Sequence, residues 1–192
     1  MTPERRMGPV ESPTGAAMLD AAELILLEEG YAALSSPRVA EYTGATRRLV
    51  YYYFRTMDDL VLETLKRFSR RELDRLENAA RSERPLDELW NNCINTSDAP
   101  ILSEFMAVAN RDENVREEVV SFIERSRKIQ AKVLRNAISK SHIHLSLVTP
   151  EALAFVATSL SLALNREAAL GVKMGHSLII SRLKQLVQLV EP

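Results

Sequence analysis

A short basic segment near the N-terminus carries residue types that bind nucleic acid. Residues 44–55 contain Arg47, Arg48 and Arg55 and no acidic residue, although the whole chain has a formal net charge of −1. An arginine side chain can bind guanine through two hydrogen bonds or pair with a phosphate. Three consecutive tyrosines occupy positions 51–53 of the segment, and a tyrosine hydroxyl can donate to a phosphate. The segment is therefore a candidate DNA-contacting site.

Two short helices with a tight turn between them must position this segment. The sequence predicts one helix that begins near Ser36 and ends at Gly44, and a second from about Thr46 to Phe54, which is the helix-turn-helix pattern. Val50 and Phe54 share the inward face of the second helix, and the arginines and tyrosines occupy the other faces. Free N–H groups at its N-terminus attract phosphate. The alternative is a set of half-buried tyrosines beside a solvated basic surface.

The rest of the chain is predicted to be helical. Apolar residues recur at helical spacing almost everywhere, and no window alternates as a strand does. The expected fold is all-α with about nine helices, near residues 14–29, 36–44, 46–54, 58–80, 86–95, 98–110, 112–139, 150–171 and from 175 onward. Residues 1–13 are expected to be a flexible arm, 14–60 a helix-turn-helix domain and 61–192 a second helical domain. Arg5 and Arg6 of the arm could enter a minor groove, but we favour an uncontacted tail.

Composition excludes several other functions. Of 192 residues, 25 are Lys or Arg and 26 are Asp or Glu, so only a local surface can be basic. The single cysteine, Cys93, rules out an intramolecular disulfide and a cysteine-based zinc site, which suits the cytoplasm. The charge-free apolar stretch 152–165 is too short to cross a bilayer. His142 and His144 point to different helix faces, so no metal and no cofactor are expected.

An ordered series of N-terminal motifs resembles the TetR family of bacterial transcriptional regulators. The similarity covers about residues 16 to 65, a third of the chain, and the motifs are Leu19-Asp20-Ala21-Ala22, Glu29-Gly30-Tyr31, Val39-Ala40-Glu41, Gly44-Ala45-Thr46, Tyr51-Tyr52-Tyr53-Phe54 and Asp59-Leu60. The resemblance implies a homodimeric repressor with a three-helix DNA-binding head on each subunit. It also implies a C-terminal domain that binds a small molecule, which releases the repressor from a palindromic double-stranded DNA operator.

The residues predicted to contact DNA lie in and around the two short helices. They are Ser36, Arg38, Thr46, Arg47, Arg48, Tyr51, Tyr52, Tyr53 and Arg55. The segment also departs from the usual family pattern. Arg48-Leu49 stands where Gly-Thr is usual, Tyr53 where His is frequent, Met57 where a phosphate-binding Lys is usual and Arg38 where an acid is frequent. An operator preference different from that of typical relatives is therefore expected.

The C-terminal third is predicted to form the dimer interface. The helix over 150–171 is apolar or small on nearly all sides, and the last helix carries one apolar stripe. The interface residues expected from this pattern and from the resemblance are Leu153, Ala157, Leu160, Ser161, Leu164, Ile179, Leu183 and Leu186. Burial within a single domain is the alternative interpretation.

A pocket for a largely apolar effector is expected among the helices between residues 58 and 171. Its candidate lining residues are Trp90, Cys93, Phe105, Met106, Phe122 and Asn165, although each aromatic or methionine could instead belong to the core. No phosphate loop, dinucleotide fingerprint or nucleophile elbow is present, and we do not expect an enzyme. The alternatives to a DNA-binding regulator are a helical protein-interaction module and an enzyme with an unrecognised site.

Overall fold

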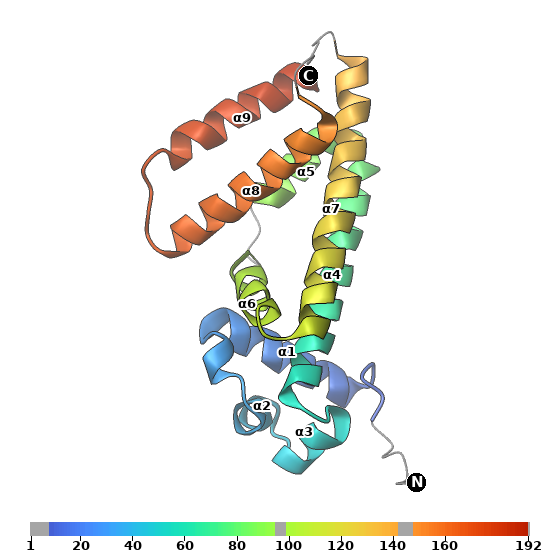
Figure 1. The fold of residues 1–192 in the computed structure, drawn as a ribbon, viewed down its shortest axis with the longest axis vertical. Helices are drawn as coiled ribbons and strands as arrows, with labels where there is room; N and C mark the ends of the chain where they lie inside the picture. The colour runs from blue at the N-terminus through green and yellow to red at the C-terminus, as the bar shows by residue number, and fades with distance from the viewer. Residues whose placement is uncertain (1–7, 95–98, 142–147, 192) are drawn as a thin grey trace. The chain divides into compact units, whose positions relative to one another are not determined.

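The computed structural model describes residues 8–94, 99–141 and 148–191. These residues form an all-helical fold with no strand, which confirms the predicted fold class. Figure 1 labels the nine α-helices and omits the short 3-10 helix η1. Their bounds are α1 Pro13–Glu28, η1 Tyr31–Ala33, α2 Ser36–Thr43, α3 Arg47–Tyr53, α4 Met57–Ala80, α5 Pro85–Ile94, α6 Ala99–Ala109, α7 Glu113–Lys140, α8 Pro150–Ala169 and α9 His176–Val190.

The chain divides into two compact units that do not follow a single cut in the sequence. The first comprises residues 1–68 and 101–119, and the second comprises residues 69–100 and 120–192. The helix-turn-helix pair α2–α3 therefore shares its unit with most of α6 and the start of α7. Among the described residues, no helix combines the length and the apolar character that a membrane span requires.

The first unit is held together by a core from α1, α2, α3, α4, α6 and α7. Met18, Ile25, Val39 and Val50 are fully buried there. Local signals set the helix ends: the Ser12 hydroxyl accepts from the Gly15 N–H at 3.1 Å and begins α1. Thr56 and Asp59 exchange hydrogen bonds of 3.0 Å and begin α4, which is the reciprocal capping arrangement.

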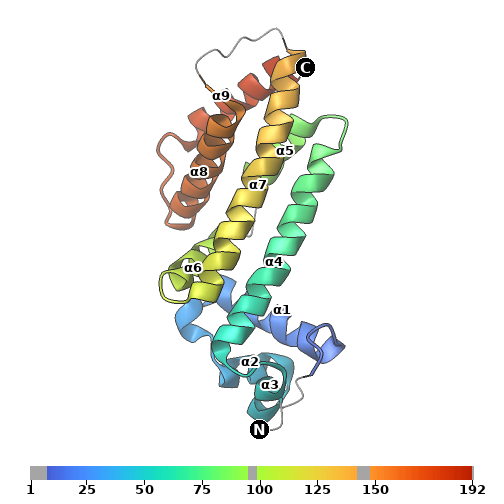
Figure 2. The ribbon, with the colours of Figure 1, turned by 45° about the vertical axis from the view of Figure 1, so that its right-hand side comes forward.

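The second unit is built around α5, which contacts both α8 and α9 (Figure 2). Its core contains Leu76, Leu86, Leu89 and Val133, with Val187 of α9 packed against them. The Glu191 carboxylate accepts from the backbone N–H groups of Leu86 and Asp87, at 3.1 and 3.0 Å. The C-terminal end of α9 is thereby tied to the N-terminus of α5, where a negative charge is favourable.

Candidate nucleic-acid interface and apolar cavity

The turn between α2 and α3 depends on one glycine and one threonine. Gly44 follows α2 with a φ of 65°, in the left-handed region, which a residue with a Cβ adopts only at a cost. The Thr46 hydroxyl then accepts from the Leu49 N–H at 3.3 Å and begins α3. These two residues set the angle at which α3 leaves α2, and thus which of its faces is exposed.

The exposed face of α3 carries the predicted basic and aromatic side chains. Val50 and Phe54, which are 0% and 1% exposed, anchor the helix and the residue after it in the core. Arg47 and Arg48 are exposed, and so is Arg55 just beyond the helix end. The other exposed side chains of α3 are Leu49, Tyr51 and Tyr52, at 36%, 42% and 42%. Six neighbouring side chains therefore form one surface, which we call the α3 face: Arg47, Arg48, Leu49, Tyr51, Tyr52 and Arg55.

Tyr53 points the other way and anchors the N-terminal segment. It is 9% exposed, and the Ser12 hydroxyl donates to its phenol oxygen at 3.2 Å. Gly8 lies so close to the Tyr53 ring that an added Cβ would be 2.5 Å from it. The Gly8 N–H also donates to the Tyr52 carbonyl at 3.3 Å. The structure thus gives Tyr53 a supporting position behind the α3 face. Arg5 and Arg6 lie outside the described residues.

Ser36 is also placed behind the surface. It is 5% exposed, and its hydroxyl donates to the phenol oxygen of Tyr51 at 3.2 Å. This bond joins the first turn of α2 to α3 and fixes the direction of the Tyr51 ring.

Arg38 of α2 is engaged by acidic neighbours. Its guanidinium lies 2.9 Å from the Glu29 carboxylate and 2.7 Å from that of Glu41, and 4.7 Å above the Tyr42 ring. The hydrogen bond from Arg38 lowers the pKa of Glu29, and the same bond raises the pKa of Arg38. Because two carboxylates already balance its charge, we expect Arg38 to bind a phosphate more weakly than the arginines of the α3 face do.

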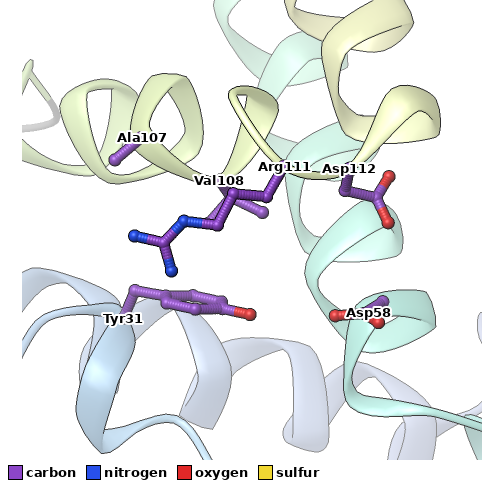
Figure 3. A pocket seen from close by; sticks show the side chains of 6 residues that line it. All are labelled: Tyr31, Asp58, Ala107, Val108, Arg111 and Asp112. Carbon is purple, nitrogen blue, oxygen red and sulfur yellow. The ribbon is translucent and has the colours of Figure 1, made fainter.

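A small pocket of about 150 Å³ lies elsewhere in the first unit. It is lined by Tyr31, Asp58, Ala107, Val108, Arg111 and Asp112. Figure 3 shows the Arg111 side chain extending toward the Tyr31 ring, while the Tyr31 hydroxyl points toward Asp58. Nearby, the Glu104 carboxylate of α6 accepts from the Tyr31 backbone N–H at 2.9 Å. The pocket therefore lies where α6 and the α6–α7 turn meet η1.

The second unit contains a larger apolar cavity of about 310 Å³, which we call the α5–α9 cavity. Helices α5, α7 and α8 of the expected range 58–171 line it, and α9, which lies beyond that range, completes the lining. The lining residues are Leu86, Leu89, Trp90, Cys93, Gln130, Leu134, Ile138, Leu153, Val156, Ala157, Leu160, Leu183, Leu186, Val187 and Val190. Burial raises the pKa of the Cys93 thiol to about 11. The thiol is consequently uncharged near neutral pH.

Only two of the six residues expected to contact a ligand line this cavity, Trp90 and Cys93. Asn165 lies beside it and uses its amide within the fold, because Nδ2 donates to the Ser161 carbonyl at 2.9 Å and to the Cys93 carbonyl at 3.4 Å. Phe122 is buried in the second unit outside the cavity lining. Phe105 and Met106 belong to the first unit, where Phe105 packs against Phe68 with ring centroids 5.7 Å apart.

Most residues expected at a dimer interface line the α5–α9 cavity or are at least partly buried. Leu153, Ala157, Leu160, Leu183 and Leu186 line the α5–α9 cavity. Ser161 and Leu164 are buried, each 8% exposed, and Ile179 is partly buried. Leu186 is nevertheless 55% exposed, and the other strongly exposed apolar side chains of the two helices were not expected at the interface: Phe155 at 52%, Val156 at 56%, Leu178 at 63% and Leu189 at 69%. Val156 and Leu186 also belong to the cavity lining. Composition could not separate the two sets, because α8 is apolar on nearly every side.

Within the described parts of the chain, no group of three or more histidine, cysteine, aspartate or glutamate residues is arranged to hold a metal ion. His142 and His144, the pair weighed from the sequence, lie outside those parts.

Comparisons with solved structures show the same fold over most of the chain. A protein described as a transcriptional regulator from Saccharomonospora viridis, solved in complex with choline, matches with a TM-score of 0.77 and 17% identity, covering 90% of this chain and 92% of that one. The reduced form of E. coli NemR matches with a TM-score of 0.77 and 17% identity, covering 91% and 97%. FadR, the fatty acid degradation regulator from Bacillus halodurans, matches with a TM-score of 0.70 and 14% identity, covering 92% and 95%. Among curated proteins, none matches the sequence.

The glycine turn and the exposed α3 face define a helix-turn-helix protein with an additional all-helical unit. Residues 18–64 match the family model described as "Bacterial regulatory proteins, tetR family". Together with the fold, this match confirms the resemblance: the N-terminal region matches the model of the TetR family, and the chain shares the fold of a solved TetR/AcrR regulator.

Proposed function

We propose that this protein is a ligand-responsive transcriptional repressor that binds a palindromic DNA operator as a homodimer. The observation that carries the proposal is the α3 face, where Arg47 and Arg48 project from the second helix of a helix-turn-helix. Such a helix fits the major groove of B-DNA. The whole chain has a net charge of −1, so the positive charge of these exposed arginines is concentrated locally on the α3 face.

The side chains of the α3 face suit both tasks of a DNA-reading helix. Arg47, Arg48 and Arg55 can pair with phosphates or with guanine. The hydroxyls of Tyr51 and Tyr52 can donate to phosphate oxygens. Leu49 is 36% exposed between them and can contact a thymine methyl group. Because Leu49 stands where the family usually has a threonine, we expect base preference at that position to differ from that of typical relatives.

The homodimer is supported by the outward faces of α8 and α9. Phe155, Leu178 and Leu189 are each more than half exposed, and exposed large apolar side chains on the same two helices favour a contact site there. A two-fold contact buries the same patch on both copies. It would also give the two heads two-fold symmetry, which requires operator half-sites about 34–36 Å apart. Sedimentation of the purified protein tests this directly, and Phe155→Glu should shift the mass to that of a monomer.

The effector role is supported by the α5–α9 cavity in the second unit. One relative with the same fold was solved with choline bound. We propose that a ligand in the cavity favours a state in which the DNA-binding heads no longer fit the operator. Because coupling between two sites is reciprocal, operator DNA must then weaken effector binding by the same factor.

The experiment is selection of bound duplexes from a random library by the full chain, followed by affinity measurement with the enriched duplex. We expect an enriched sequence with two-fold symmetry. Arg47→Ala should abolish the enrichment, whereas the matched variant Arg81→Ala should retain it. Arg81 is an arginine with a side chain 72% exposed in the second unit, paired with Glu77. Equal enrichment by both variants, or none by the unaltered protein, would refute the proposed DNA-binding role of α3.

A further inference from the structure

We propose that the α5–α9 cavity selects an uncharged, largely apolar molecule with one neutral polar group, and that this group pairs with the amide of Gln130. The proposal rests on the effector role assigned to the cavity above and names the chemical class of the effector.

Among the described residues, none that lines the cavity carries a charged side chain. Of its lining residues, only Gln130, Cys93 and Trp90 have a polar atom in the side chain, and the others are hydrocarbon. Since burial keeps the Cys93 thiol protonated near neutral pH, it supplies no negative charge either. The volume of about 310 Å³ is at the lower end of the roughly 300–1,000 Å³ of small-molecule sites. The wall therefore offers a small, almost entirely apolar environment.

A charged ligand would be poorly accommodated by this wall. A carboxylate would leave water without gaining an arginine or a lysine from the described lining residues, and the N-terminus of α5 at Leu86 is already bonded to the Glu191 carboxylate. An ammonium group would gain no carboxylate from the described lining residues. A quaternary ammonium can instead be held over several aromatic rings. Of the lining residues that the structure describes, Trp90 is the only aromatic one. Choline, which is bound to the Saccharomonospora viridis regulator, is thus a poor guide to the ligand of this chain.

The hydrogen bonds of Gln130 within the protein engage only one end of its side-chain amide, so the other end can bind a ligand. The Thr158 hydroxyl lies 2.8 Å from Gln130 Oε1 and 2.7 Å from the Ala154 carbonyl oxygen, but it has a single hydrogen. If it donates to Gln130, the amide NH₂ is left for the ligand. If it donates to Ala154, the amide turned by 180° donates to Thr158 and its carbonyl is left for the ligand.

Because Gln130 is buried, the polar end of its amide that has no partner in the protein favours a ligand with a polar group. The residue is 7% exposed and lies in the cavity lining. Buried polar groups are nearly always paired, and an unpaired one is costly. A hydroxyl, carbonyl or amide on the ligand satisfies either orientation of Gln130 without bringing a charge into the cavity. This is why a single neutral polar group is part of the proposal.

The chain supplies its own reporter for a test. Trp90 is the only tryptophan in the protein and lies in the cavity lining, so its fluorescence responds to occupancy without a label. Purified full-length protein is titrated with four probes of equal chain length: 1-octanol, octanoate, octylammonium and 1-chlorooctane. We expect 1-octanol to bind at least about 100-fold more tightly than octanoate or octylammonium, because only the two charged probes must give up the hydration of an ionic group.

The role of Gln130 is tested by Gln130→Met, which keeps the side chain's length and removes its amide. We expect 1-octanol to bind about threefold to tenfold more weakly, the worth of one hydrogen bond, while 1-chlorooctane affinity is unchanged and shows that the cavity is intact. Gln185→Met is the matched control, because Gln185 is exposed on α9 and bonds Arg182 at 3.0 Å. It should change neither affinity.

Four results would overturn the proposal. The first is octanoate or octylammonium binding as tightly as 1-octanol. The second is a Gln130→Met variant that binds 1-octanol as the unaltered protein does. The third is no Trp90 response to any probe in protein that still binds its selected duplex. The fourth is a 1-octanol affinity that falls as protein concentration rises. This last pair would mean a cavity without a small-molecule role, or one filled by a second copy. DNA binding is measured separately, so the proposed operator binding stands or fails independently.

Discussion

The salt dependence of DNA binding should separate the arginines of the α3 face from Arg38. Each phosphate contact lowers log K by about 0.9 per decade of salt. Arg47, Arg48 and Arg55 are exposed and make no ion pair with the described residues. If each neutralises one phosphate, the two heads of a dimer give a slope of about −5. Between 50 and 200 mM salt, affinity should then fall about 1,000-fold.

Two variants test whether the slope of log K against log salt counts the phosphate contacts of individual arginines. Arg48→Ala removes one contact per head, so the slope should become less steep by about 2. Arg38→Met combined with Glu29→Gln keeps the net charge of the cluster with Glu41 unchanged, because one cation and one anion are removed together. It should leave the slope as it is. Arg38 is thereby compared with Arg48 at constant charge.

Fluorescence anisotropy with a labelled copy of the selected duplex measures the slope between 50 and 200 mM salt. Circular dichroism of the double variant confirms that α2 is intact. If the double variant flattens the slope as much as Arg48→Ala does, Arg38 leaves its carboxylates to bind phosphate, and the reasoning from its ion pairs is refuted. If Arg48→Ala leaves the slope unchanged, exposure on α3 is not a guide to phosphate contact.

Three further predictions concern the two units separately. Phe105→Ala should lower the free energy of unfolding by about 3–5 kcal/mol in urea, because Phe105 is fully buried; a loss below 1 kcal/mol would contradict that packing. The pKa of Cys93 is raised to about 11, so at pH 8 it should hold about 100-fold less thiolate than a free thiol and be alkylated correspondingly slowly. The free energy of unfolding should fall as the pH rises from 9.0, the ordinary pKa of the thiol, toward 11, because the thiol of the unfolded chain loses its proton first. Glu191→Gln should weaken the cap on α5 by about 1 kcal/mol, and an unchanged denaturation midpoint would show that the cap adds nothing.

The helix-turn-helix could be predicted from the sequence because its signals are local. Gly44 ends α2 by its backbone conformation, and Thr46 begins α3 through its own hydroxyl. The spacing of Val50 and Phe54 assigned the inward face correctly. Each of these signals acts within a few residues, so the sequence alone shows them.

The environment of individual side chains depends on distant residues and could not be predicted. Tyr52 and Tyr53 are neighbours of the same type, yet Tyr53 is buried because Gly8 and Ser12, some forty residues earlier, pack against it. Arg38 is engaged because Glu29 precedes α2 by several residues. An acid nine residues before a basic side chain is a weak signal by itself. It becomes informative only once the path of the chain through η1 is known.

Helix α6 lies outside the helix-turn-helix but contacts the elements that flank it. Glu104 accepts a hydrogen bond from the backbone N–H of Tyr31 in η1, and the next residue, Phe105, packs against Phe68 of α4. Since η1 ends shortly before α2 begins, any displacement of α6 must either break the Glu104 bond or carry η1 with it. Within this unit, α6 therefore contacts both η1, which leads into α2, and α4, which follows α3.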